Sequence, residues 1–163
     1  MVKSASDGVA AFVRATTGGE KSGELLVITG WRHPDWEELF SFAQPVHVGR
    51  GHVLIRKHAS ERALFFLASG LLEVTAILGT HSLGPIAKIH PGSVVGELAF
   101  LDGMPRSAKV WAVSDSDLYR LDFADYERFA AAHPQQTCDL LFAIGRVVAL
   151  RLRHSRTRLA QSS

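Results

Sequence analysis

Residues 96–110 read GELAFLDGMPRSAKV, and this stretch decides both the expected fold and the expected function of the chain. It places a carboxylate (Glu97) and a guanidinium (Arg106) around a short apolar segment. Free main-chain N–H groups at a helix start attract an anion, and the planar Arg fork adds paired charge-assisted hydrogen bonds. An ionised Glu only accepts hydrogen bonds, so Glu97 suits a sugar hydroxyl and repels a phosphate. A site with both groups predicts a sugar phosphate or a nucleotide as the ligand.

The same stretch resembles the phosphate-binding cassette of the cyclic nucleotide-binding domain family. That cassette has the form Gly-Glu-(apolar)-Ala, a short spacer, then Pro-Arg-(small)-Ala-x-Val, and residues 96–99 and 105–110 match its two halves. The resemblance implies that Arg106 binds the cyclic phosphate and Glu97 the ribose 2′-hydroxyl, with cyclic AMP or cyclic GMP as the ligand and no cofactor. The other cradle residues that it implies are Gly96, Leu98, Ala99, Ser107 and Ala108.

Two other interpretations of the cassette stay open. Arg106 could be a structural residue paired with Glu97 or Asp102, as in a member that has lost its ligand. The chain would then be a protein-interaction or dimerisation module without nucleotide binding. The match departs from the family pattern at Lys109, where many members carry Thr or Ser.

The composition indicates one soluble globular domain. The chain has 163 residues, of which 47% are hydrophobic and 21% charged, with a net charge of +2. That modest charge argues against a dedicated nucleic-acid binder. The single cysteine, Cys138, excludes an internal disulfide and fits a reducing compartment, so we expect a cytoplasmic protein. No apolar run approaches the roughly 20 residues that span a bilayer, so we expect no membrane partner.

Short strand signals separated by turn residues fill the centre of the chain and predict a mainly β fold. The expected architecture is a β-roll or jelly-roll barrel with an N-terminal helix and a long C-terminal helix that acts as a lid. Ser69-Gly70 is expected to form a hairpin, and turns are expected at 79–81 and 91–92. The family usually keeps a Gly after the second strand, where this chain has Lys57-His58, so that turn is expected to be atypical. The strands are expected near 45–48, 52–56, 63–68, 71–78, 82–90, 94–95 and 110–121.

The expected domain organisation has three parts. Residues 1–30 are rich in Gly, Ser and Thr and are expected to form a flexible leader; the phosphate-loop look-alike at 18–23 lacks the Gly-Lys-Ser/Thr ending. Residues 31–155 are expected to form the cyclic nucleotide-binding domain, and residues 156–163 a basic tail. The family's DNA-binding members continue into a helix-turn-helix domain after the long helix, so we expect no DNA partner.

Three helices are expected within the domain. Pro34 and the acidic residues after it favour a helix start, and Asp122 is expected to cap a helix over 123–132. The lid helix is expected to run from Pro134 to about Arg153. Its apolar face could seal the roll or pair two protomers into a homodimer; that face is formed by Leu141, Ile144, Val148 and Leu152. The base of the nucleotide is expected to contact the roll wall or this helix, the candidates being Val94, Val95, Arg146 and Arg151.

Catalysis and metal binding find no support in the sequence. The chain has eight histidines, but the spacing of His47, His52 and His58 fits no metal-ligand signature. Cys138 lacks the setting of a nucleophile, and no Gly-x-Ser-x-Gly elbow is present. We therefore expect a regulatory or sensor protein and not an enzyme.

Overall fold

The strands form two four-stranded antiparallel sheets rather than a closed barrel. The computed structural model describes residues 5–18, 24–78 and 81–161. One sheet has the order β1-β8-β3-β6 and the other β2-β7-β4-β5. The strands are β1 (Gln44–Val48), β2 (Val53–Ile55), β3 (Ala63–Ser69), β4 (Leu72–Leu78), β5 (His81–Ile89), β6 (Val94–Val95), β7 (Lys109–Ala112) and β8 (Ser116–Asp122). The expected mainly β roll with flanking helices is confirmed.

Strand β3 is buried on both faces, and this explains its unbroken apolar sequence. Because side chains alternate along a strand, Phe65 and Leu67 point into the core between the two sheets. Leu64 and Phe66 point to the other side, where the helices pack. Sheet β1-β8-β3-β6 therefore separates two cores, one between the sheets and one under the helices.

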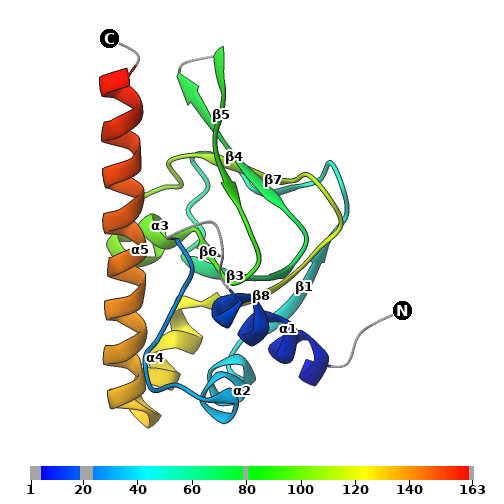
Figure 1. The fold of residues 1–163 in the computed structure, drawn as a ribbon, viewed down its shortest axis with the longest axis vertical. Helices are drawn as coiled ribbons and strands as arrows, with labels where there is room; N and C mark the ends of the chain where they lie inside the picture. Colours follow the sequence, from blue (N-terminus) through cyan, green and yellow to red (C-terminus); the bar gives the residue numbers. More distant parts are fainter. Residues whose placement is uncertain (1–4, 19–23, 79–80, 162–163) are drawn as a thin grey trace.

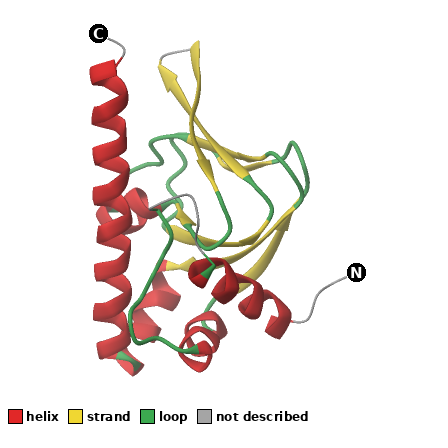
Figure 2. Cartoon of the chain, viewed as in Figure 1, coloured by secondary structure: helices red, strands yellow, loops and turns green. Residues whose placement is uncertain are grey.

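In the described part of the chain, five helices cover the side and the base of the strands (Figures 1 and 2). Their bounds are α1 (Ala5–Thr17), α2 (His33–Ser41), α3 (Glu97–Asp102), α4 (Phe123–Ala132) and α5 (Pro134–Gln161). Helix α5 runs along one side of the molecule over most of its height and passes beside α3 (Figure 1). Leu140, Ile144 and Val147 of α5 are fully buried, so one face of this helix belongs to the core.

The expectation of a flexible leader over residues 1–30 is wrong for most of the described residues. Val9, Phe12, Val13 and Thr16 recur at helical spacing, so α1 presents one face to the core. Phe12 is fully buried and makes edge-on ring contacts with aromatic residues of α2 and β3. The composition of the leader hid this short pattern. Residues 19–23, which include most of the phosphate-loop look-alike, lie outside the described residues.

The expected hairpin at Ser69-Gly70 is also wrong, because β3 and β4 belong to different sheets. Gly70 has a φ of +94°, and a Cβ there would lie 2.2 Å from the Ser116 Oγ. Only glycine fits this crossing from one sheet to the other. The hairpin is made instead by β4 and β5, which pair directly, with residues 79–80 of the expected turn outside the described part.

Two helix ends differ from expectation. Asp122 precedes α4, but its side chain makes no capping hydrogen bond; Arg120 donates to it instead, with Nε 2.9 Å from Oδ1. Helix α5 does not end near Arg153 but continues to Gln161, so residues 156–161 of the expected basic tail are helical.

Phe12→Ala is expected to lower the free energy of unfolding by about 3–5 kcal/mol, because it leaves a cavity under a fully buried ring. Chemical denaturation followed by circular dichroism measures this. The control Met104→Ala removes a side chain that is 63% exposed and is expected to change stability by less than about 0.5 kcal/mol. Equal losses in both variants would show that α1 does not pack as described.

Candidate functional site

A cavity of about 750 Å³ lies between sheet β2-β7-β4-β5, helix α3 and helix α5. This volume is in the range of small-molecule sites, which are mostly apolar with a few polar groups. Ile55, Val74, Ile86 and Ile89 contribute apolar side chains from the sheet, and α5 contributes Val148, Leu152 and Ser155. Charged side chains gather at the α3 end of the cavity; they are Glu24, Glu97, Arg106 and Arg151.

Among the described residues, no carboxylate forms an ion pair with the buried cation of Arg106. Its side chain is 3% exposed, and it donates from Nη1 to the Gly96 carbonyl at 3.0 Å and from Nη2 to the Ala63 carbonyl at 2.8 Å. Within the described part of the chain, its Nε has no hydrogen-bond partner. Burial lowers the pKa of Arg106 from its usual value, and attraction to Glu61 and Glu97 offsets this only in part. A buried charge in this state favours a bound anion.

The main chain of Arg106 is held by the turn that follows β2. The Arg106 N–H donates to the Ala59 carbonyl and the His58 N–H to the Arg106 carbonyl, both at 2.9 Å. His58 has a φ of +67°, the left-handed conformation that glycine adopts most easily. The atypical turn predicted at Lys57-His58 therefore places Arg106.

Gly96 allows α3 to approach the Arg106 guanidinium. It has a φ of +87°, and a Cβ there would lie 2.6 Å from Arg106 Nη1. The first helical bond of α3 runs from the Phe100 N–H to the Gly96 carbonyl. The main-chain N–H groups of residues 97–99 precede that bond and have no partner within the helix.

Glu97 lies at the start of α3 and pairs with Arg151 of α5. Its side chain is 11% exposed, and its Oε1 lies 2.8 Å from Arg151 Nη1. This single contact leaves acceptor capacity on the carboxylate for a further donor. Arg151 was expected as a base contact; the structure shows it as the partner of Glu97.

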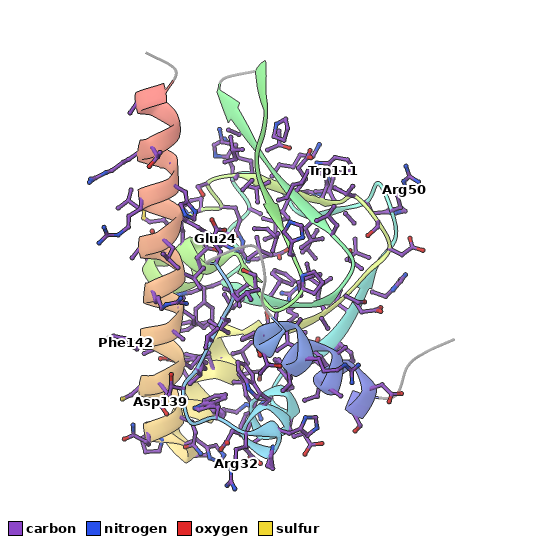
Figure 3. The ribbon with its side chains drawn as sticks, in the orientation of Figure 1. Glu24, Arg32, Arg50, Trp111, Asp139 and Phe142 are labelled. Carbon is purple, nitrogen blue, oxygen red and sulfur yellow. The ribbon has the colours of Figure 1, made fainter. Side chains whose placement is uncertain are left out.

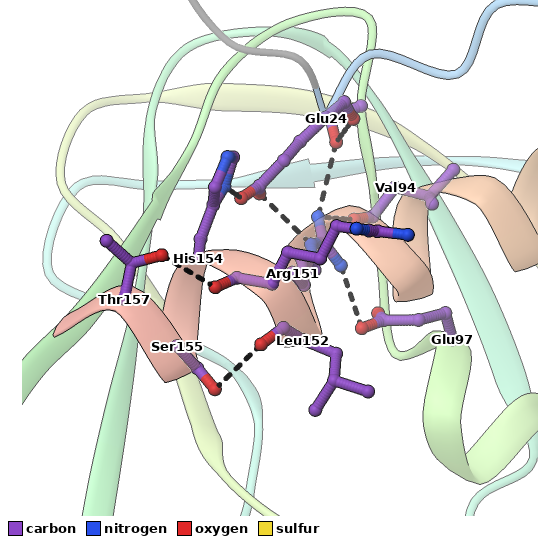
Figure 4. Close-up of polar contacts among 10 residues, drawn as sticks. Glu24, Val94, Glu97, Arg151, Leu152, His154, Ser155 and Thr157 are labelled. Carbon is purple, nitrogen blue, oxygen red and sulfur yellow. Dashed lines mark hydrogen bonds and ion pairs between the residues drawn. The ribbon is translucent and has the colours of Figure 1, made fainter. Parts of the chain in front are cut away.

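Arg151 also binds Glu24, which lies beside α5 (Figure 3). Arg151 Nε is 3.1 Å from Glu24 Oε2, and His154 Nδ1 is 3.0 Å from Glu24 Oε1 (Figure 4). Burial raises the pKa of Glu24, but the hydrogen bonds from His154 and Arg151 outweigh it, so the net pKa lies below the usual 4.5. The charges of Glu97 and Glu24 in turn raise the pKa of Arg151, against the effect of its burial.

The structure brings most of the predicted site residues together. Those that line the cavity are Val95, Gly96, Glu97, Leu98, Ala99, Arg106, Ser107, Ala108 and Arg151. The alternative in which Arg106 pairs with Glu97 or Asp102 is not what the structure shows: Arg106 binds main-chain carbonyls, and Asp102 accepts from the Met104 N–H.

Two predicted base contacts lie away from the cavity lining. Val94 points into the core under the helices, on the opposite side of β6 from Val95. Arg146 is exposed on α5 and donates to the Leu25 carbonyl at 3.4 Å. Both departures follow from side-chain direction, which the sequence does not fix.

Sequence reasoning missed Glu24 and the hydroxyl of Ser155 as cavity residues. Glu24 lies in a Gly- and Ser-rich stretch without periodicity, so no local signal marks it. Among the described residues, no three metal-binding side chains cluster closely enough to hold an ion. In the same part of the chain, no helix combines the length and the apolar character that crossing a membrane needs.

Comparison with known proteins identifies the family. The model of the cyclic nucleotide-binding domain matches residues 45–133, more than half of the 163 residues. The cAMP-dependent protein kinase regulatory subunit of Dictyostelium discoideum is 29% identical over 103 residues, covering 60% of this chain and 32% of that protein. Glutaminase 2 of Bradyrhizobium diazoefficiens is 33% identical over 109 residues, covering 65% of this chain and 16% of that protein. The chain thus spans a third or less of these relatives.

Solved structures agree in fold. A cyclic nucleotide-binding domain from Methylobacillus flagellatus KT superposes with a TM-score of 0.82 at 21% identity, covering 98% of this chain and 86% of that one. The catabolite activator protein of Thermus thermophilus gives a TM-score of 0.71 at 25% identity, covering 83% of this chain and 62% of that one. The chain belongs to the cyclic nucleotide-binding domain family.

The lowered pKa of Glu24 predicts how stability changes with pH. Since its folded-state pKa lies below the unfolded value of 4.5, its contacts contribute fully above about pH 4.5 and are lost as the pH falls through the folded-state pKa. Glu24→Gln is expected to cost about 1–3 kcal/mol at pH 7. Denaturation from pH 7 to pH 3 should show the difference from wild type shrinking below pH 4.5; a difference that does not depend on pH would contradict the assignment.

Proposed function

We propose that the cavity binds a cyclic nucleotide, cyclic AMP or cyclic GMP, and that the chain is a regulatory module. The observation that carries this proposal is Arg106, a buried guanidinium that has no carboxylate partner in the described part of the chain and faces the same cavity as Glu97. A cyclic nucleotide supplies both missing partners, because its phosphodiester is an anion and its ribose carries a hydroxyl next to it. Membership of the family makes this the first ligand to test.

The ligand would enter with its phosphate toward Arg106 and the N–H groups at the start of α3. The free acceptor capacity of Glu97 would take the ribose 2′-hydroxyl. The base would lie against the apolar wall of the cavity, with Val148, Leu152 and Ser155 of α5 across from it. Helix α5 would close as a lid, and the ligand shifts the open–closed equilibrium by its differential affinity for the two states.

Arg106→Ala is expected to weaken binding by about 2–5 kcal/mol, roughly 30-fold to several-thousand-fold, because it removes the partner of the phosphate. Glu97→Ala is expected to cost less, about 1.5–3 kcal/mol, as for a hydrogen bond to a charged group. Titration calorimetry with cyclic AMP and cyclic GMP measures both variants.

Arg128→Ala is the matched control for Arg106→Ala, because Arg128 is 68% exposed on α4 and pairs with Asp125. It is expected to bind like wild type. Equal affinities for wild type and Arg106→Ala would refute the site. No heat with either nucleotide would favour the alternative of an interaction module that has lost its ligand.

A catalytic function is not proposed, although a Ser, a His and an Asp meet at the edge of sheet β1-β8-β3-β6. His47 Nδ1 lies 2.8 Å from Asp117 Oδ1, and Ser69 Oγ donates to Asp117 Oδ2 at 2.9 Å. The hydroxyl thus donates to the carboxylate and not to the imidazole. A general base that activates a serine must accept its proton, and His47 does not accept the proton of Ser69. Ser69 is therefore not arranged as a nucleophile.

We also propose that α5 pairs two copies of the chain. Phe142 is 82% exposed and points away from the rest of the molecule (Figure 3). Cys138, Gly145 and Ala149 are exposed on the same face at alternating spacings of four and three, the heptad spacing of a helix seam. A second copy offers an identical seam, so a two-fold dimer would cover this face without any other partner.

Phe142→Glu is expected to keep the chain monomeric at concentrations where wild type dimerises, because it places a charge in the centre of the seam. Sedimentation equilibrium over a concentration series measures this. Met104→Glu, at an exposed residue outside α5, is the control and is expected to dimerise like wild type. A wild type that stays monomeric at every concentration would contradict the dimer.

A further inference from the structure

Arg151 of α5 is shared by two carboxylates that come from distant parts of the chain. Glu97 belongs to the cassette and holds Nη1, whereas Glu24 belongs to the segment before α2 and holds Nε. The other oxygen of Glu24 receives His154, one turn further along α5. Both oxygens of Glu24 are therefore bound by the lid helix (Figure 4).

Arg151 belongs to a hydrogen-bond network that includes main-chain groups, and is more than one half of an isolated ion pair. Its Nη2 donates to the Val94 carbonyl at 2.7 Å and to Ser93 Oγ at 3.2 Å. Ser93 Oγ in turn donates to the main-chain carbonyl of Glu24 at 2.7 Å. Glu24 is thus fixed through both its main chain and its side chain.

The exposure of these side chains determines how strongly the network contributes to stability. Exposed ion pairs contribute little, because water and salt screen them. Here the exposed fractions are 17% for Arg151, 13% for Glu24 and 11% for Glu97. Removing one member would leave a largely desolvated charge without its partner, which is the costly case.

The network joins three elements around the cavity. Glu24 anchors the N-terminal segment, Arg151 the lid and Glu97 the cassette. The N-terminal segment is also tied to its surroundings by the Leu26 N–H, which donates to the Gly92 carbonyl at 2.9 Å, and by Trp31, whose Nε1 donates to Asp139 of α5 at 3.2 Å. Glu24 and Arg151 both lie outside residues 45–133, the part that matches the family model.

We propose that Glu24 is a positioning residue of the ligand cavity: it holds Arg151 so that α5 stays closed and Glu97 keeps the orientation that a ligand hydroxyl needs. This inference rests on the proposed function. Because coupling between sites is reciprocal, a ligand at Glu97 would also strengthen the docking of residues 24–31 against α5. The docking of residues 24–31 against α5 would therefore depend on whether a ligand occupies the cavity.

The first experiment measures the affinity of Glu24→Gln for cyclic AMP and cyclic GMP by titration calorimetry at pH 7. The dissociation constant is expected to rise by about tenfold or more, as for the loss of a hydrogen bond between charged groups. Glu38→Gln is the matched control: it removes the same charge from another Glu–His pair, with Glu38 Oε1 2.9 Å from His133 Nε2, and neither residue lines the cavity. Its affinity is expected to stay at the wild-type value.

A double-mutant cycle separates positioning from a general structural role. If Glu24 acts through Arg151, then Glu24→Gln has little further effect on the affinity of Arg151→Ala. Additive effects would overturn the inference. Should Glu24→Gln not fold, Glu24→Asp keeps the charge but shortens the side chain, and it is expected to weaken binding by a smaller factor.

These experiments distinguish a failure of the inference from a failure of the proposed function. If wild type binds and Glu24→Gln binds equally well, the inference fails and the proposed function stands. If wild type binds neither nucleotide, the proposed function fails, and lid closure is decided by amide hydrogen exchange of α5 in the ligand-free chain. Faster exchange at residues 147–157 in Glu24→Gln than in Glu38→Gln would support closure by Glu24, and equal exchange would overturn it.

Discussion

The burial of one positive charge is the constraint on which the site depends. Arg106 is held by the carbonyls of Gly96 and Ala63, which satisfy part of its hydrogen-bonding capacity but carry no full negative charge. Its main chain is fixed by the turn at His58, and its approach to α3 requires a glycine at 96. These requirements are met by residues far apart in the sequence. A buried cation in such a setting favours an anion beside it.

A second charge arrangement connects this site to the rest of the chain. Arg151 brings the lid helix to Glu97, and Glu24 brings the N-terminal segment to Arg151. Helix α1 packs on β3 and on α2. Glu24 therefore lies between two helices, α1 and α2, that belong to the same core. The N-terminal segment, helix α5 and the start of α3 are thus linked through the one guanidinium of Arg151.

Local patterns explain which structural expectations the structure confirms. The apolar run of β3, the turn residues around 91–92 and the Pro at the start of α2 and α5 each carry their own physical cause, so the strands and helices lie close to where they are expected. The expectations are wrong where contacts between distant parts of the chain determine the local structure. The residues Ser69-Gly70 favour a turn, but their sequence does not distinguish a hairpin from a crossing between sheets. The packing of Gly70 against Ser116 makes this turn a crossing. The Gly- and Ser-rich composition of residues 1–30 likewise gave no sign of helix α1, which packs on the core through Phe12, a residue buried among aromatic rings.

The sequence by itself determined the family, the roll and the cassette, because the motif residues of the cassette stand at fixed spacings along the chain. The tertiary structure alone decided that Arg106 binds main-chain carbonyls, that Arg151 faces Glu97 whereas Arg146 does not line the cavity, and that Glu24 belongs to the cavity. The physical reason is that spacing along a chain fixes local conformation. The partner of a charged side chain is fixed by which surfaces fold against each other, and Glu24 meets Arg151 and His154 of α5 only in the folded chain.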